Sequence, residues 1–167
     1  IMKVADMKLR ERENPNLFIV EGPEEHAIAR KLIKEYVDSL GFSLEFQDID
    51  NELDQLNTVY GHPSGLILLA KVSDEFVGVT CLRNLGNFIA EIKRMYVKPD
   101  HRGKGLGRKM LNKAKYEAKR LGYRFLRLDT VPDMESAIHL YTSEGFYEIE
   151  DFGTNPIKGA RFMEYKL

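Results

Sequence analysis

The stretch Arg102-Gly103-Lys104-Gly105-Leu106-Gly107 lies between a predicted strand, 90–97, and a predicted helix, 104–121. A helix that begins in such a turn leaves its first backbone N–H groups without intrahelical acceptors. The helix dipole adds partial positive charge there, and glycine permits both positive φ and the close approach of a ligand. The turn therefore predicts a binding site for an anion, with phosphate as the best match.

Two common phosphate-binding loops are excluded by their spacing. A Walker A loop needs Gly-x-x-x-x-Gly-Lys-Ser/Thr, which the chain lacks, and a Rossmann fingerprint needs a third glycine where Arg108 stands. What remains is Arg-x-x-Gly-x-Gly, formed by Arg102, Gly105 and Gly107. Further along, after Asp129-Thr130-Val131-Pro132, comes a second pattern, Ala137-Ile138-His139-Leu140-Tyr141-Thr142-Ser143-Glu144-Gly145-Phe146.

Taken together, these two patterns resemble the signatures of the GNAT N-acetyltransferase superfamily. The first matches its acyl-CoA loop, Gln/Arg-x-x-Gly-x-Gly/Ala, and the second matches Ala-x-x-Leu-Tyr-x-x-x-Gly-Phe. One departure is Ser136, where many members carry Asn. The resemblance covers roughly 17–167 and implies a mixed α/β fold. Its central sheet would be flanked by helices and splayed between the fourth and fifth strands, with acyl-CoA entering the gap.

Length and composition predict one globular domain. A chain of 167 residues with 43% hydrophobic residues can bury a sizeable core. We expect 1–16 to be an N-terminal extension that could be flexible, and 17–167 to be a single acetyltransferase domain. The chain has no apolar run of membrane-spanning length and no apolar segment typical of a signal peptide. Cys81 is the only cysteine and lies in an apolar strand, which favours a buried thiol and a cytoplasmic setting.

Positive charge is concentrated in one part of the chain. Between Lys93 and Arg127 there are 13 Lys or Arg against two acids, although the whole chain has a net charge of −1. Nucleic-acid binding is one interpretation of such a stretch, but no nucleic-acid motif accompanies it. The phosphates of CoA explain the charge as well, so we expect CoA and not nucleic acid as the anionic partner.

Hydrophobic periodicity and turn residues predict strands and helices in a mixed order. The expected strands are 17–20, 66–72, 76–82, 91–97, 124–131, 146–150 and 161–166, and the expected helices are 24–40, 51–59, 104–121 and 133–144, the last with Asp133 as N-cap. The strands 91–97 and 124–131 flank a helix and should be parallel. Strand alternation places Glu91, Lys93, Met95 and Val97 on one face.

Acetyl transfer to an amine needs a group that removes a proton from the amine and a group that protonates the departing thiolate. The resemblance implies Glu91 as the base; an ion pair with Lys93 or Arg94 is the alternative for this carboxylate, and a water relay is the alternative base. Tyr141 is the candidate acid, since a phenol with an ordinary pKa of about 10 is protonated at neutral pH. Packing in the core is the alternative for Tyr141.

The resemblance also implies how acetyl-CoA is held. The N–H of Met95 would bind the thioester carbonyl, backbone groups of Val97 would pair with pantetheine, and the glycine turn with its basic side chains would bind the pyrophosphate. The expected cofactor contacts are Met95, Tyr96, Val97, Arg102, Gly103, Lys104, Gly105, Leu106, Gly107 and Arg108. We expect no metal, because the histidines His26, His62, His101 and His139 lack the spacing of a metal site.

The acceptor is the part of the reaction that the sequence determines least. The resemblance places its pocket between Phe42–Leu53 and the loop Phe152–Arg161. Candidate lining residues are Phe46, Gln47, Glu52, Arg83, Asp129, Asn155 and Phe162. We expect a primary amine, a small molecule, to attack acetyl-CoA directly in a ternary complex. A protein lysine or N-terminal acetyltransferase and a non-catalytic acyl-CoA-binding module are the alternatives, and a homodimer is left open.

Overall fold

The structure is a computed structural model that describes residues 15–44, 48–153 and 155–167. In chain order the elements are β1 (Asn16–Ile19), α2 (Pro23–Ser39), α3 (Ile49–Asp54), α4 (Leu56–Val59), β2 (Leu66–Val72), β3 (Glu75–Gly86), β4 (Ile89–Val97), the 3-10 helix η2 (Pro99–His101), α5 (Leu106–Arg120), β5 (Phe125–Thr130), α6 (Glu135–Ser143), β6 (Tyr147–Ile149) and β7 (Arg161–Lys166). No helix among the described residues is long and apolar enough to cross a membrane.

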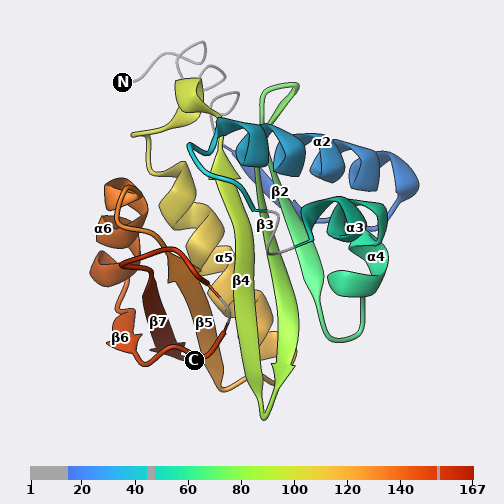
Figure 1. Ribbon diagram of the computed structural model, residues 1–167. Helices are drawn as coiled ribbons and strands as arrows, with labels where there is room; N and C mark the ends of the chain where they lie inside the picture. The colour runs from blue at the N-terminus through green and yellow to red at the C-terminus, as the bar shows by residue number, and fades with distance from the viewer. Residues whose placement is uncertain (1–14, 45–47, 154) are drawn as a thin grey trace, which may run out of the picture.

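The strands form one mixed sheet in the order β1-β2-β3-β4-β5-β7-β6, which runs through the middle of the molecule (Figure 1). β1 to β4 are antiparallel neighbours, and β5, β7 and β6 form a second antiparallel set. β4 and β5 join the two sets as the parallel pair. The predicted mixed α/β fold with parallel fourth and fifth strands is therefore confirmed.

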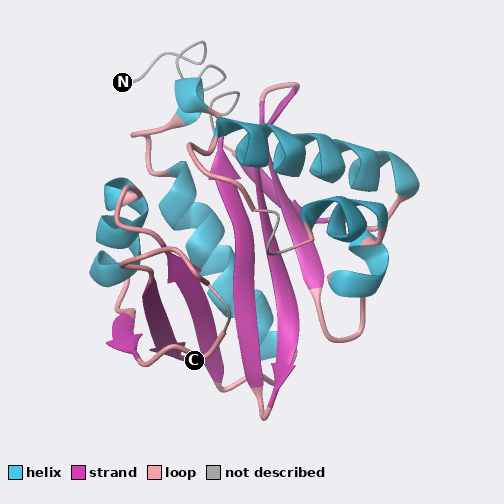
Figure 2. Cartoon of the chain, viewed as in Figure 1, coloured by secondary structure: helices cyan, strands magenta, loops and turns pink. Residues whose placement is uncertain are grey.

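Helices cover both faces of this sheet (Figure 2). On one face α2, α3 and α4 pack against β2, β3 and β4, with Leu32, Ile33 and Leu69 in the core. On the other face α5 and α6 bury Leu111 and Tyr141 against the same sheet. The sheet is consequently buried from both sides.

The parallel pair is short, and the two strands separate beyond it. In the described structure Ile89 to Glu91 of β4 pair with Phe125 to Arg127 of β5, and the pairing does not continue to the end of β4. The remainder of β4, from Ile92 to Val97, pairs only with β3. This is the predicted splay between the fourth and fifth strands, and it leaves backbone groups of β4 facing a gap.

A β-bulge interrupts β4 at Arg94 and Met95. Lys93 pairs with Cys81 and Tyr96 pairs with Val79, so two residues of β4 face one residue of β3. Arg94 has φ of +55°, a left-handed value that is rare outside glycine.

The predicted alternation along β4 is wrong because of this bulge. The extra residue reverses the alternation, so that Met95 and Val97 pack on the α5 side while Glu91 and Lys93 face the α3 side. Arg94 and Tyr96 turn to the α2 and α3 side as well.

Three further local expectations differ from the structure. The single helix 51–59 is two short helices that meet at Gln55. α6 is capped by Met134 instead of Asp133. α5 begins at Leu106 rather than at 104, because Gly105 is left-handed and ends the turn. The predicted extension falls mostly on 1–14 and lies outside the described residues, as do the acceptor candidates at 46 and 47.

Candidate active site

The glycine turn lies directly before α5 and is exposed to solvent. Gly103 and Gly105 have φ of +72° and +79°, which glycine adopts without strain. Gly105 is the N-cap of α5, and a Cβ placed on it would meet open space. The first amides of α5 therefore face a region that an anion can enter.

The side chains beside the turn tie it to β4. The Arg102 Nε donates a hydrogen bond of 2.8 Å to the Val97 carbonyl, and its guanidinium lies 5.6 Å from the centre of the Tyr96 ring. Tyr96 and Leu106 are buried, so neither offers a side chain to the solvent beside the turn. Arg102 thus already occupies one of the β4 acceptors expected to face pantetheine.

Arg108, on the first turn of α5, points toward the end of α6. Arg108 forms an ion pair with Glu144, and its Nη2 lies 3.2 Å from the Ser143 hydroxyl at the end of α6. Lys104 is exposed on the turn. A Cβ on Gly107 would lie 3.4 Å from Leu140 and 3.8 Å from the Met95 side chain. A small residue at this position therefore keeps α5 close to α6 and β4.

Tyr141 and Met95 meet on the α6 side of the splay. The Tyr141 hydroxyl lies 3.7 Å from the Met95 sulfur, and its ring packs on Phe146 with centroids 5.8 Å apart. Burial raises the pKa of Tyr141, and the nearby Asp129 carboxylate raises it further. The phenol is therefore protonated over the whole physiological pH range and can supply a proton but not remove one.

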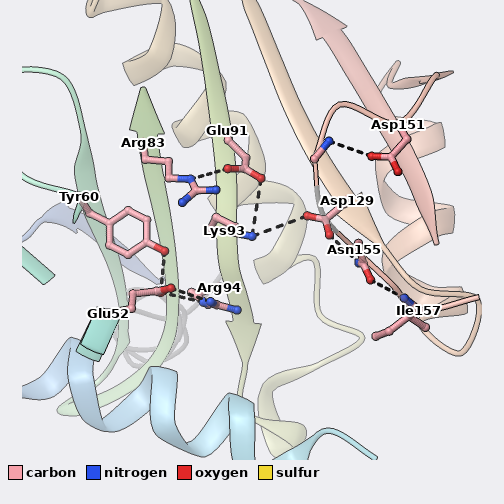
Figure 3. A network of polar contacts seen from close by, with 11 residues as sticks. Glu52, Tyr60, Arg83, Glu91, Lys93, Arg94, Asp129, Asp151, Asn155 and Ile157 are labelled. Carbon is pink, nitrogen blue, oxygen red and sulfur yellow. Dashed lines mark hydrogen bonds and ion pairs between the residues drawn. The ribbon is translucent and has the colours of Figure 1, made fainter. Parts of the chain in front are cut away.

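Glu91 faces the other side of the sheet, the α3 side, and is part of a network of charged residues (Figure 3). Its carboxylate accepts a bond of 2.5 Å from the Arg83 Nε, and the Lys93 ammonium lies 3.7 Å away. The Lys93 ammonium also lies 3.9 Å from Asp129, which accepts a bond of 2.7 Å from Asn155. Glu91 thus forms the ion pair with Lys93 that was the alternative to catalysis, and Arg83 adds a stronger partner.

Arg94 forms its ion pair with Glu52 and not with Glu91. Its guanidinium donates two hydrogen bonds, of 2.8 and 2.7 Å, to the carboxylate of Glu52 on α3. The Tyr60 hydroxyl donates a third bond of 2.6 Å to the same carboxylate. Of the two alternative partners of Glu91, the structure therefore pairs it with Lys93, while the Arg94 guanidinium is bound by Glu52.

Two adjacent hollows flank these residues. The smaller, of about 90 Å³, lies at the splay and is lined by Tyr141 and Met95 together with side chains of α2 and β5. The larger, of about 360 Å³, lies between α3, β4 and the segment that joins β6 to β7. Lys93, Arg94, Asp129 and Asn155 line both hollows, so the two meet at these residues.

The larger hollow collects the predicted acceptor candidates that the structure describes. They come from α3, β3, β5, the β6–β7 segment and β7, and they are Glu52, Arg83, Asp129, Asn155 and Phe162. Glu91 lines this hollow but not the smaller one, whereas Tyr141 lines only the smaller one. The two catalytic candidates therefore lie on different sides of the residues shared by the hollows.

Some residues of the site were missed in the sequence. Tyr36 and Met134 line the smaller hollow, and Arg94 lines both, although none was a candidate. A signal for the bulge was present, since the alternation of charged and apolar residues from Glu91 to Lys93 breaks at Arg94, a second consecutive charged residue. Tyr36 carries no comparable signal, because an aromatic residue on an amphipathic helix is typical of a core.

Comparison with known proteins assigns the chain and its fold to a family. Residues 26–146 match the family described as acetyltransferase (GNAT) family. The chain is 32% identical to an uncharacterized N-acetyltransferase of Schizosaccharomyces pombe, over 92% of this chain and 96% of that protein. It is also 32% identical to an IAA acetyltransferase of Azospirillum brasilense, over 92% of this chain and 99% of that protein.

Solved structures share the same architecture. An acetyltransferase from Streptococcus agalactiae superposes with a TM-score of 0.75 at 20% identity, over 92% of this chain and 98% of that one. A GNAT family acetyltransferase from Elizabethkingia anophelis, with acetyl-CoA bound, superposes with a TM-score of 0.62 at 21% identity, over 93% and 99% of the two chains.

Replacing Gly105 with Val should weaken the binding of acetyl-CoA. The side chain would fill the open space in front of α5 and force a β-branched residue to a φ of +79°. We expect the dissociation constant, measured by titration calorimetry, to rise at least about tenfold, or about 1.4 kcal/mol.

The matched control is Gly122→Val at the other end of α5, where φ is +90° and the space is also open. It introduces similar backbone strain without approaching the turn, so the affinity for acetyl-CoA should stay within about twofold of wild type. Equal affinities for folded Gly105→Val and wild type would show that the phosphates bind elsewhere.

Proposed function

Because the chain belongs to the GNAT family of acetyltransferases, we propose that it transfers an acetyl group from acetyl-CoA to a small-molecule amine. Family membership makes the protein an N-acetyltransferase with acetyl-CoA as its co-substrate. The kind of acceptor and the roles of individual residues are the proposal. One observation carries it: the two hollows meet at Lys93, Arg94, Asp129 and Asn155.

The dimensions of the hollows favour a small acceptor. A volume of about 360 Å³ is within the range of small-molecule sites, which lies at roughly 300–1,000 Å³. Its lining mixes the Phe152 and Phe162 rings with charged groups that are paired to one another. A protein lysine or N-terminus as acceptor is the second candidate, and such an acceptor would need an extended groove leading to the hollow.

The reaction is a direct attack in a ternary complex. The acceptor amine occupies the boundary of the two hollows, and acetyl-CoA enters the splay with its phosphates at the glycine turn. A C–N bond forms as the C–S bond breaks, the amine loses a proton, and the CoA thiolate takes one up. Glu91 lines only the acceptor side, so in this proposal it removes the amine proton through an intervening water.

On the acetyl side, backbone and phenol act together. The Met95 N–H, at the bulge of β4, donates to the carbonyl oxygen as negative charge develops there. Tyr141 supplies a proton to the thiolate, which is supported by its burial, its raised pKa and its position beside Met95. For Val97 to pair with pantetheine through its carbonyl, the Arg102 side chain would have to move away.

We place this reaction in a reducing, cytoplasmic setting, which the buried free thiol of Cys81 supports. The basic stretch on α5 is assigned to CoA and not to nucleic acid or a membrane. A homodimer is compatible with this proposal and is not needed by it, because both hollows are lined by one chain.

A screen of amines and peptides tests the acceptor class. Small primary amines and lysine-containing peptides are each incubated with acetyl-CoA, and free CoA is measured with a thiol reagent. We expect at least one small amine to be acetylated with a kcat/KM well above that of any peptide. Efficient acetylation of peptides alone would favour a protein acetyltransferase, and no transfer despite acetyl-CoA binding would favour a non-catalytic module.

Replacing Tyr141 with Phe should lower turnover and leave binding intact. The ring and its packing remain, and the lost hydroxyl has only a weak contact with the Met95 sulfur. We expect kcat to fall by about one to three orders of magnitude, the range typical of a general acid. Acetyl-CoA affinity should change by less than about threefold.

Tyr116→Phe is the matched control, since this phenol is exposed on the outside of α5. Burial raises the pKa of Tyr141, so the phenol should stay protonated between pH 6 and 9. Deprotonation of Tyr141 should therefore cause no decline of wild-type kcat over this range. An unchanged kcat for Tyr141→Phe, under conditions where chemistry limits the rate, would remove Tyr141 from the mechanism.

Replacing Glu91 with Gln should lower the rate most at neutral pH. The amide cannot accept the amine proton, whereas at higher pH more of the acceptor is already deprotonated. The ratio of wild-type to variant kcat/KM should therefore shrink between pH 6 and 9. Because Glu91 is buried against Arg83, we also expect stability to fall by roughly 1–3 kcal/mol in denaturant unfolding.

Asp129→Asn is the informative comparison, because Asp129 lines both hollows. If Asp129→Asn shows this pH-dependent loss while Glu91→Gln keeps the wild-type profile, Asp129 is the base. If neither variant loses rate in a pH-dependent way, a water relay alone removes the proton.

A further inference from the structure

A buried polar cluster lies where α3 meets the bulge of β4. Glu52 and Arg94 form a bidentate ion pair whose side chains are only 8% and 4% exposed. The Tyr60 hydroxyl, also buried, completes the hydrogen bonding of the Glu52 carboxylate (Figure 3). We call the Glu52–Arg94 pair the clamp.

The clamp holds a backbone conformation that β4 would not otherwise prefer. Arg94 has φ of +55°, where a side chain with a Cβ is disfavoured. The two hydrogen bonds to Glu52 fix the plane of the guanidinium and thereby limit the positions that the Arg94 Cα can take. Arg94 directly precedes Met95, so its backbone dihedrals set the direction of the Met95 N–H.

We propose that Glu52 is a positioning residue for acetyl transfer: through the buried clamp it keeps Arg94 left-handed and so aims the Met95 N–H at the acetyl carbonyl. This inference rests on the proposed function, in which that N–H stabilises the developing negative charge. Glu52 touches neither the acetyl group nor the thiolate in this role, because it acts through Arg94.

The electrostatics of the cluster agree with this role. Burial alone would raise the pKa of Glu52, but the hydrogen bonds and charge of Arg94 outweigh it and lower the pKa. The clamp is thus ionised on both sides. A buried ion pair contributes little net stability, since the cost of desolvation offsets the attraction, but its geometry is highly specific.

Steady-state kinetics of Glu52→Gln, with the best amine from the screen, test the clamp. The amide keeps the size of the side chain and weakens both bonds to Arg94. If the Met95 N–H no longer points at the acetyl carbonyl oxygen, kcat should fall about 10- to 100-fold. Glu52 lines the larger hollow, but its carboxylate is bound by Arg94 and Tyr60, so the KM for the amine and the dissociation constant of acetyl-CoA should change by less than about threefold.

The matched control is Glu117→Gln on α5. Glu117 is equally buried, with a side chain 3% exposed, and pairs with Lys113 and Arg120 at 2.8 and 2.6 Å, outside both hollows. Its loss removes a buried carboxylate without touching the bulge, so kcat should stay within about twofold of wild type.

A fully apolar replacement separates positioning from stability. Combining Glu52→Met, Tyr60→Phe and Arg94→Met removes the whole polar cluster without leaving an unpaired charge, which keeps the chain folded even if Glu52→Gln does not fold. We expect a melting temperature at or above that of Glu52→Gln and a kcat still at least about tenfold below wild type. A folded apolar variant, or a folded Glu52→Gln, with wild-type kcat would overturn the inference.

The wild-type protein separates this inference from the proposed function. If wild type acetylates amines and the clamp variants match it, only the positioning role fails. If wild type binds acetyl-CoA but acetylates none of the amines, the proposed function fails and the positioning role fails with it.

Discussion

The separation of β4 from β5 is the constraint on which the rest of the site depends. Two parallel strands normally continue to pair, but here they pair only from Ile89 to Glu91 of β4. Beyond Glu91 the bulge at Arg94 changes the direction of the β4 side chains, and the β5 strand diverges. A gap with unpaired backbone groups on one side can be closed by an extended ligand that adds hydrogen bonds, as a strand would.

Placement of the helices follows from that separation. α5 begins at the open end of the gap, so the amides and dipole of its first turn are available at the mouth of the splay. α6 lies across the same region and brings the Tyr141 hydroxyl to the Met95 sulfur. α3 lies on the opposite face and reaches the bulge through Glu52. The gap is therefore bordered by the N-terminus of α5, a phenol and a buried ion pair.

Charged side chains are paired at the larger hollow and exposed to solvent at the glycine turn. At the larger hollow, ionised groups form matched pairs: Arg94 and Glu52 are both buried, and the buried Glu91 pairs with the partly exposed Arg83. Such pairs are costly to desolvate, and they orient polar ligands because their remaining lone pairs and N–H groups point in fixed directions. At the glycine turn, by contrast, the side chains of Arg102 and Lys104 are exposed to solvent.

The sequence by itself determined the order of strands and helices, the left-handed glycine turn at Gly103 and Gly105 before α5, and the family. These features depend on local patterns: apolar periodicity, glycine where φ is positive, and short motifs with fixed spacing. The tertiary structure alone decided that Arg94 pairs with Glu52 across 42 residues of sequence, that Glu91 pairs with Arg83, and that Met95 and Val97 face α5. A bulge of one residue reverses every side chain that follows it, and no local propensity records which carboxylate from a distant helix will meet the displaced arginine.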